Sequence, residues 1–401
     1  MISSAKIAAF RKQLPQIAGR IYFNHGVISL TPKQVADASC VGVRAGMHMY
    51  VDPKVRQKWW DIRSETRAMC AGLIGAKADD IAFVQSTSAA LSLVSLSIPW
   101  KSGDNVVSAT VENPATVVPW QNLSHLGVSV KYAPAGADDQ IDVNKVIAAI
   151  DERTRVVALS LVEYSTGQRL NIKKICAYCK PRNILVSIDA VQAVGAIPVD
   201  VQDLGVNFLS TGALKWLLGP VNIGFIYVDP VTAQLIRSPI LTESNVTDIK
   251  LEEEESSTGS PPQLNANQGA LKLEAMPYLN FPGVYGLHRA LTTFAELGKD
   301  NIYARIKALT DELIVGLQRM DLRVVSPRGA DQWSGLVAFE TGGVPTRQVV
   351  DQLRARQVFV AMRKGRIRAS PHFYNTSAEV RAFLKELAQA MTSSRTSSAG
   401  G

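Results

Sequence analysis

The chain has 401 residues, of which 46% are hydrophobic, and its 43 basic and 35 acidic residues give a formal net charge of +8. This length indicates two or three domains with an ample apolar core. The basic residues are scattered, without an arginine-rich tract or interleaved aromatic residues, so we expect no nucleic-acid partner. No apolar run reaches the roughly 18 residues that span a bilayer, so we expect no membrane partner.

The N-terminus and the cysteines favour a cytoplasmic protein. Residues 1–20 lack a long apolar segment and a small-residue cleavage site, and are more typical of a short amphipathic helix than of a secretory signal. Four cysteines in a chain of this length do not form a disulfide framework. Cys176 and Cys179 form a lone C-x-x-C without the second pair that a zinc site needs, so packing is favoured over a redox or metal role.

Helical periodicity covers residues 54–76, and strand-like and helix-like segments alternate after it. The predicted strands are 80–85, 105–110, 128–134, 155–164, 184–191, 206–212 and 223–228, with helices predicted at 86–98 and 142–150. Continuous β-branched runs separated by helices predict a largely parallel α/β sheet with both faces covered. In such sheets, ligands bind beyond the carboxyl ends of the strands.

The α/β pattern breaks at residues 251–269, where an acidic run followed by Ser, Gly and Pro predicts a mobile loop. One long helix is predicted over about 283–319, followed by a smaller α+β region. Its predicted strands are 322–327, 334–340 and 367–372, and its predicted helices are 346–356 and 377–391. We therefore divide the chain into an N-terminal segment that packs with the small domain, a large domain, a small domain and a disordered tail: 1–30, 31–282, 283–391 and 392–401.

Two polar stretches fall at the ends of predicted strands. Ser86, Thr87 and Ser88 end one strand and open a helix, where backbone N–H groups and hydroxyls can hold a phosphate. Asp189 follows the apolar run 184–188, and a carboxylate there needs hydrogen bonds or a cationic partner such as a protonated ring nitrogen. Taken alone, both stretches are also explained by helix capping.

Lys215 is the only charged residue in "STGALKWLLGPVNIGF", which follows another predicted strand. An amine at a dry strand end, close to an anion site, can have a depressed pKa and form a Schiff base. A phosphate cradle, a carboxylate and an isolated lysine at one sheet edge are the set that binds pyridoxal 5'-phosphate (PLP). The sequence therefore predicts PLP as the cofactor.

The run from Ile188 to Val228, with its D-x-x-Q and K-W-L-L-G-P elements, resembles the core of the class V aminotransferase-like family of PLP enzymes. That family includes cysteine desulfurases, selenocysteine lyases and isopenicillin N epimerase-like proteins. The resemblance extends from "YFNHGVISLTP" to "IRASPHFYNT", nearly the whole chain. It implies the PLP-dependent transferase fold (fold type I), an α/β large domain with a mostly parallel seven-stranded sheet and a smaller α+β domain. It also implies a homodimer with the active site at the interface.

The resemblance implies how the cofactor is held. Lys215 matches the lysine that carries PLP, Asp189 the ring-nitrogen carboxylate, and Gln192 the residue near the phenolic oxygen. Thr87 and Ser88 match the phosphate-binding turn.

The resemblance also implies contacts around the cofactor and the substrate. Asn113 stands where many members stack a histidine or aromatic residue on the ring, and Thr211 is a further phosphate contact. Arg368 matches the arginine that binds the substrate carboxylate, a role that suits a guanidinium fork. His25 and Tyr164 are candidate substrate contacts.

Several positions depart from the family pattern. Leu214 stands where a histidine is usual, and Gly212 where a phosphate-binding serine is usual. Met276 and Pro277 stand where the partner subunit supplies a Gly-Thr pair, so phosphate anchoring could differ. Residues 356–370 contain no cysteine, whereas desulfurases carry a nucleophilic cysteine there, so we do not expect a cysteine-nucleophile desulfurase.

These features predict an enzyme that acts at Cα of an L-amino acid or amino-acid conjugate, with Lys215 as the base. The leading reaction is β-elimination, as in a C–S or C–X lyase. The alternatives left open are an epimerase, an aminotransferase and a PLP-fold protein without catalysis. The acidic segment 252–260 is expected to shape substrate access.

Overall fold

The computed structural model describes residues 2–136, 138–241, 246–247, 265–266, 268–274 and 280–398. The helices are α1 Ser4–Arg11, α2 Lys33–His48, α3 Pro53–Ile74, α4 Thr87–Ser97, α5 Pro114–Gln121, α6 Val143–Ala148, α7 Ile172–Cys179, α8 Val201–Leu204, α9 Pro230–Leu235, α10 Phe281–Leu297, α11 Lys299–Gln318, α12 Thr346–Ala355 and α13 Ser377–Ser398. The strands are β1 Ile21–Tyr22, β2 Ile81–Val84, β3 Asn105–Ala109, β4 Ser129–Ala133, β5 Thr154–Ser160, β6 Leu185–Asp189, β7 Phe208–Gly212, β8 Gly224–Val228, β9 Val246–Thr247, β10 Asn265–Ala266, β11 Val337–Phe339, β12 Val358–Phe359, β13 Ala361–Arg363 and β14 Arg366–Ala369.

A seven-stranded sheet forms the centre of the large domain, in the order β2-β8-β7-β6-β5-β3-β4. Only β8 runs against the other strands, which confirms the predicted mostly parallel sheet. Along β5, Val156 packs with the apolar residues of α4 and α5, whereas Val157 packs on the opposite face with those of α7. This alternation explains why the strands read as continuous apolar runs: helices bury both faces.

The carboxyl ends of the parallel strands meet at one edge of this sheet. Ser160 at the end of β5 lies opposite Asp189 at the end of β6, and Asp189 lies opposite Ser210 of β7. The polar residues that end the predicted strands are therefore neighbours in space, although about 50 residues separate Ser160 from Ser210 in the chain.

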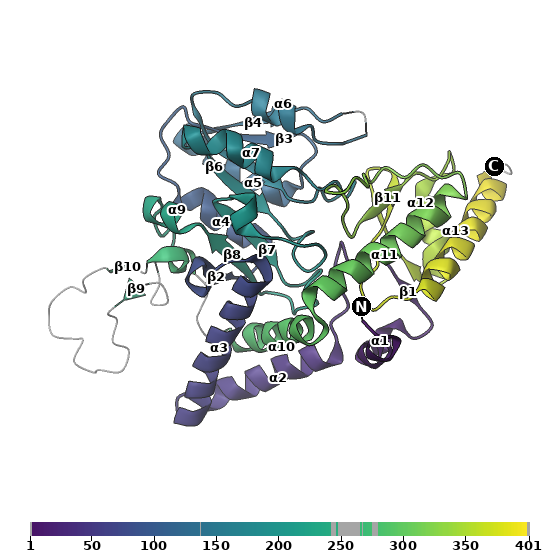
Figure 1. Cartoon of the computed structure of the whole chain (residues 1–401), viewed down its shortest axis with the longest axis horizontal. Helices are drawn as coiled ribbons and strands as arrows, with labels where there is room; N and C mark the ends of the chain where they lie inside the picture. The colour runs from purple at the N-terminus through teal and green to yellow at the C-terminus, as the bar shows by residue number, and fades with distance from the viewer. Residues whose placement is uncertain are drawn as a thin grey trace.

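The small domain is built on the three-stranded sheet β11-β14-β13, which α11, α12 and α13 cover. Figure 1 shows it on the side of the molecule opposite α9. Strand β1 pairs in parallel with β12 of this domain, so the N-terminal segment lies against it. The large sheet and this smaller α+β unit confirm the predicted fold class.

The predicted single helix over 283–319 is wrong, because the structure divides it into α10 and α11 at Gly298. Gly298 has a φ of +79°, a backbone conformation that favours glycine and ends α10. Helix α10 lies along α2 and α3, as Figure 1 shows, and its apolar residues join the core of the large domain. The small domain was predicted to begin at 283, within this helix.

Helix α13 continues to Ser398, whereas the sequence placed residues 392–401 in a disordered tail. The side chain of Ser394 is buried, so the end of the predicted helix at 391 was too early. Met276, Pro277 and the acidic segment 252–260 lie outside the described residues. Among the helices that the structure describes, none is long and apolar enough to cross a membrane.

Candidate active site

A cavity of about 240 Å³ opens at the carboxyl edge of the central sheet. It combines hydroxyl, amide, carboxylate and amine groups that come from different strands and from the loops after them. Its lining residues are Ser86, Thr87, Ser88, Asn113, Ala115, Ser160, Val162, Tyr164, Asp189, Val191, Gln192, Leu214 and Lys215. The structure therefore brings seven of the predicted site residues into one cavity: Thr87, Ser88, Asn113, Tyr164, Asp189, Gln192 and Lys215.

The N-terminus of α4 forms one wall of the cavity. The Ser86 hydroxyl caps the helix by accepting a hydrogen bond from Ala89 N at 3.1 Å, and Thr87 is buried at its first position. A Cβ at Gly212 would lie 3.2 Å from Thr87 Oγ1 and 3.6 Å from Thr87 N. Glycine at 212 therefore keeps the end of β7 clear of this helix terminus, where partial positive charge and hydroxyl donors suit a phosphate.

Asp189 is buried and held in one orientation. Its Oδ1 accepts a hydrogen bond from Val191 N at 2.9 Å, and its Oδ2 accepts one from Thr116 Oγ1 at 3.3 Å. Burial raises the pKa of this carboxyl, whereas the Val191 bond, the charge of Lys215 and the Thr116 bond oppose the rise. A cationic ring nitrogen in the cavity would stabilise the carboxylate form.

A second buried carboxyl supports this region, and the sequence analysis missed it. Glu112 accepts hydrogen bonds from Ser160 N at 2.7 Å and from Ser160 Oγ at 2.6 Å. The Ser160 hydroxyl lies 3.4 Å from Thr116 Oγ1, which in turn donates to Asp189. Ser160 could have been noted as a polar residue within an apolar predicted strand. No residue near Glu112 in the sequence indicates that its partner lies 48 residues away.

Lys215 lies in the turn after β7 and lines the same cavity. Burial lowers the pKa of this amine to about 8, with Asp189 opposing the shift and Arg368 and Arg363 adding to it. Leu214, which replaces the usual histidine, lines the cavity, and its carbonyl accepts a hydrogen bond from Ser29 N at 2.9 Å. The expectation of an amine in a dry site rather than on the surface is consistent with this geometry.

Two amide side chains complete the cavity wall. Gln192 donates from Nε2 to Gly26 O at 2.8 Å and accepts at Oε1 from Trp216 Nε1 at 3.1 Å. Asn113 caps α5 by accepting a hydrogen bond from Ala115 N at 3.0 Å. Both amides are fixed by the protein before any ligand binds, which orients them toward the cavity at little entropic cost.

Arg368 is fully buried on β14, beside the cavity. Its Nη1 donates to the carbonyl of Tyr164, whereas its Nε and Nη2 are buried without a hydrogen-bond partner. Burial and the nearby Arg363 lower the pKa of this guanidinium to about 9. Unpaired buried donors are costly, so a two-pronged donor of this kind fits an incoming carboxylate.

The structure does not bring His25 or Thr211 to the lining of the cavity. Since a carbonyl only accepts, His25 donates from Nδ1 to Ser370 O at 2.6 Å and accepts at Nε2 from the Tyr374 hydroxyl at 2.6 Å. Both ring nitrogens are thus occupied inside the protein, which corrects the expected substrate contact. Thr211 is buried in β7 and its hydroxyl donates to Gly212 O at 3.3 Å, so its phosphate contact stays a prediction.

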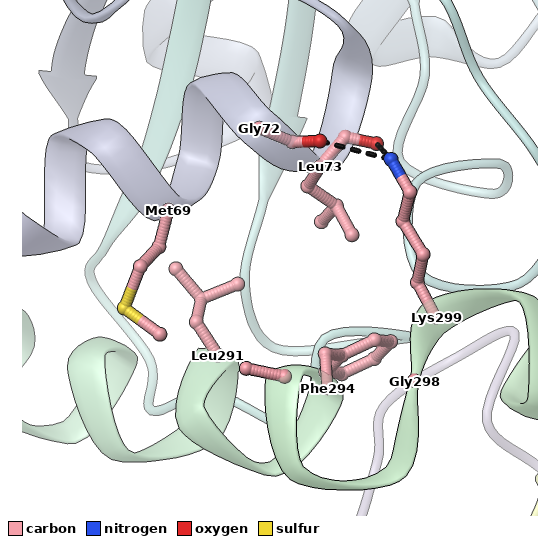
Figure 2. A pocket seen from close by; sticks show the side chains of 8 residues that line it. Met69, Gly72, Leu73, Leu291, Phe294, Gly298 and Lys299 are labelled. Atoms are coloured by element: carbon pink, nitrogen blue, oxygen red, sulfur yellow. Dashed lines mark hydrogen bonds between the residues drawn. The ribbon is translucent and has the colours of Figure 1, made fainter.

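A second hollow, of about 290 Å³, lies between α3 and α10. Figure 2 shows Leu73, Leu291 and Phe294 around it and the amine of Lys299 at its edge. That amine donates to the carbonyls of Gly72 and Leu73 at 2.9 and 3.5 Å, so it caps the end of α3. This hollow is an apolar seam between helices and carries no group suited to catalysis.

The C-x-x-C motif is part of the core. Cys176 and Cys179 lie on α7, both are buried, and both thiols are free. Burial raises the pKa of Cys176 to about 12 and that of Cys179 to about 11, which makes them poor nucleophiles. Within the described ranges, no group of three or more His, Cys, Asp or Glu side chains could hold a metal ion.

A protein of Pyrococcus abyssi named "Probable cysteine desulfurase" is 26% identical to this chain, over 96% of the chain and 98% of that protein. The expectation that excluded a cysteine-nucleophile desulfurase is therefore wrong. It rested on one missing cysteine in residues 356–370, whereas the similarity to proteins named as desulfurases extends over nearly the whole chain.

Solved structures agree on the fold. The apo cysteine desulfurase of Thermococcus onnurineus NA1 superposes with a TM-score of 0.83 at 24% identity, covering 98% of this chain and all of that one. The cystine C–S lyase C-DES, solved with its product cysteine persulfide, superposes with a TM-score of 0.82 at 22% identity, over 94% of this chain and 99% of the other.

The sequence profile of the family described as "Aminotransferase class-V" matches residues 29–385. This match confirms the predicted family and PLP as its cofactor, and the solved structures confirm the fold. The site geometry, with an amine, a carboxylate and a phosphate-binding helix end at one sheet edge, is what that cofactor requires. The chain belongs to the class V aminotransferase family of PLP enzymes.

Proposed function

We propose that this chain is a PLP-dependent lyase of the cysteine desulfurase kind. It would break the Cβ–S bond of L-cysteine or of an amino acid built on cysteine, such as cystine. The observation that carries the proposal is that Lys215 and Asp189 line one cavity, beside the buried and unsatisfied guanidinium of Arg368. The names of the sequence relatives support sulfur amino acids as the substrate class.

The residues present fit the cofactor. Thr87, Ser88 and the N-terminus of α4 would hold its phosphate, since Gly212 leaves that helix end unobstructed. Asp189 would hold the ring nitrogen, and Lys215 would hold the cofactor covalently through its aldehyde carbon. When bound, PLP supplies an electron sink for the electrons released at the substrate Cα.

Lys215 has the properties of the catalytic base. With a pKa of about 8, a sizeable fraction of its amine is unprotonated near neutral pH, so it can accept a proton from the substrate Cα. The same burial that lowers this pKa keeps bulk water away from the amine. Lys215 would then return the proton to the substrate or to the departing sulfur.

Arg368 would bind the substrate carboxylate through Nε and Nη2, the two donors that the protein leaves without a partner. Its third donor, Nη1, is held by the carbonyl of Tyr164, so the fork has a fixed direction. Fixing the carboxylate orients the Cα bonds relative to Lys215, which decides the bond that is weakened.

The proposal is tested with PLP-loaded enzyme, L-cysteine and L-cystine. We expect sulfide or persulfide release, together with alanine from a desulfurase step or pyruvate and ammonia from elimination. Lys215→Ala should abolish release, whereas the exposed Lys145→Ala should not. Release of a keto acid without any cleaved sulfur would instead favour transamination, and Cα–deuterium exchange alone would favour epimerisation; either result would reject a lyase.

We further propose that the enzyme is a homodimer. Large apolar side chains are exposed on α2 and on the turn after it: Val43, Met47, Tyr50 and Val51 are 55%, 74%, 67% and 77% exposed. Figure 1 shows α2 and α3 projecting away from the central sheet. Large apolar side chains exposed close together in the sequence support an interface with a second copy.

A further inference from the structure

A short segment near the N-terminus, residues 24–29, is bonded to the end of β14. Gly26 N donates to Ser370 Oγ at 2.9 Å, and His25 N donates to Ser370 O at 3.3 Å. Ser370 follows β14 and lies two residues after Arg368. The segment also packs against that guanidinium, because the nearest neighbours of a Cβ at Gly26 would include Arg368 Nη2 at 3.0 Å. The connecting segment, as we call residues 24–29, is therefore fixed to the strand that carries Arg368.

The connecting segment is also bonded to residues that line the active-site cavity. Gly26 O accepts a hydrogen bond from Gln192 Nε2 at 2.8 Å, and Ser29 N donates to Leu214 O at 2.9 Å. Leu214 directly precedes Lys215 in the chain. The segment therefore joins the part of the large domain that carries the amine to the small-domain strand that carries the guanidinium.

His25 holds the connecting segment through its side chain, which is fully buried. Nδ1 donates to Ser370 O at 2.6 Å, and Nε2 accepts a hydrogen bond from the Tyr374 hydroxyl at 2.6 Å. Burial lowers the pKa of this imidazole well below its usual range; the nearby His372 adds to the shift, and the Ser370 bond opposes it. The ring is therefore neutral near pH 7 and has one tautomer, with its proton on Nδ1. Its two bonded nitrogens lie at a fixed distance across a rigid ring, so the ring sets the place of Ser370 relative to Tyr374.

A second connection anchors Lys215 independently of His25. Since a carbonyl only accepts, His372 donates from Nε2 to Trp216 O at 3.0 Å, while its Nδ1 accepts from the N–H of the next residue at 2.8 Å. Trp216 directly follows Lys215 in the chain. Loss of the His25 side chain should therefore release the strand end near Arg368 more than the turn that carries Lys215.

We infer that His25 is a positioning residue, which sets the distance between the guanidinium of Arg368 and the amine of Lys215. His25 does not line the cavity and acts through Ser370, two residues from Arg368. A substrate that places its carboxylate on Arg368 and its amine at the cofactor on Lys215 requires that this distance match one amino acid. This inference rests on the roles of Arg368 and Lys215 in the proposed function.

The test uses glycine and glycinamide, of which only glycine carries a carboxylate. Each probe is titrated into the PLP-loaded protein, and its dissociation constant is read from the near-visible absorbance of the cofactor. The ratio of the two constants is compared between variants, so that the different amine basicities of the probes cancel. His25→Ala should lower the preference for glycine roughly 10-fold, within the range of one charge-assisted hydrogen bond, while the affinity for glycinamide changes less than about threefold.

Two amide variants assign the effect to one ring nitrogen. His25→Asn can keep a donor in the place of Nδ1, and so the bond to Ser370 O, and should retain most of the preference. His25→Gln can keep only an acceptor for the Tyr374 hydroxyl, and should lose the preference as His25→Ala does. The control for a general loss of stability is Val350→Ala, which removes packing from the buried face of α12 in the small domain and should keep the preference.

The preference for glycine, measured on folded and PLP-loaded protein, decides the inference. An unchanged preference in His25→Ala, or an equal loss of affinity for both probes, would overturn it. Where His25→Ala fails to fold, the two amide variants decide, since equal preferences in these two would also overturn it. A wild type that binds both probes alike would reject the carboxylate role of Arg368, and this inference with it. Neither probe carries sulfur, so a failure to cleave L-cysteine or L-cystine would reject the proposed lyase and leave the His25 result standing.

Discussion

Glu112 provides a quantitative test of the buried network behind the active site. Burial, aided by the charges of Glu163 and Asp189, raises the pKa of its carboxyl from 4.5 to about 7, although hydrogen bonds from Ser160 oppose the rise. Below pH 4.5 the folded and unfolded chains both hold this proton. As the pH rises, the unfolded chain releases it first, so stability is lost between about pH 4.5 and pH 7.

The size of the effect follows from the two pKa values. The pKa of Glu112 differs by about 2.5 between the folded and the unfolded chain. At 1.36 kcal/mol for each pKa unit, this difference lowers the free energy of unfolding by about 3.4 kcal/mol over the whole titration, of which about 2.5 kcal/mol falls between pH 5 and pH 8. Glu112→Gln mimics the protonated carboxyl: its oxygen can accept from Ser160 N and its amide can donate to Ser160 Oγ. The free energy of unfolding of the variant, relative to that of the wild type, should therefore rise by about 2.5 kcal/mol from pH 5 to pH 8.

The assay is urea unfolding of both proteins at intervals from pH 5 to pH 8, followed by tryptophan fluorescence. Glu152→Gln makes the same chemical change at an exposed position and serves as the control, with a curve expected to run parallel to the wild type. If the Glu112→Gln and wild-type curves also ran parallel, Glu112 would titrate alike in the folded and unfolded chains, and the reasoning from burial would be refuted.

Three further outcomes are expected. Lys215→Ala should abolish the near-visible absorbance of the PLP-loaded protein, measured by spectrophotometry; an unchanged spectrum would show that the cofactor is held elsewhere. Gly26→Ala should raise KM about tenfold with little change in kcat, because its Cβ would lie 2.6 Å from Leu336 Cδ2 and 3.0 Å from Arg368 Nη2 and would displace the carboxylate fork; an unchanged KM would count against that role. Changing Met47 and Val51 together to lysine should produce monomers in analytical ultracentrifugation, whereas a persisting dimer would place the interface on another surface.

The sequence located the residues whose positions depend on strand ends. Thr87 and Lys215 each follow a predicted strand, and Asp189 lies near the end of another. Parallel strands bring their carboxyl ends to one edge, so the meeting of these residues in one cavity follows from the topology. The pairing of His25 with Ser370, 345 residues away, has no local signal. A buried histidine with both nitrogens bonded and a histidine facing a substrate look alike in a linear sequence.

The face that three arginines of the small domain share also has no local signal in the sequence. The run "MRKGRIRAS" contains three arginines, and only the register of the β13–β14 pair shows that they share a face. Which of them is neutralised depends on Asp139, a residue of the loop before α6 that reaches across from the large domain. The sequence could assign a carboxylate-binding arginine by resemblance, but not count the charges left over around it.

The proposed catalytic base and the proposed carboxylate-binding arginine come from different domains. Lys215 and Asp189 stand at the edge of the central sheet, whereas Arg363 and Arg368 stand on the small-domain sheet. The Asp139 ion pairs with Arg366 and Lys364 join these two units. Under the proposed function, we therefore expect substitutions at Arg368 on β14 to act on carboxylate binding, while Lys215 and Asp189 keep their places on the central sheet.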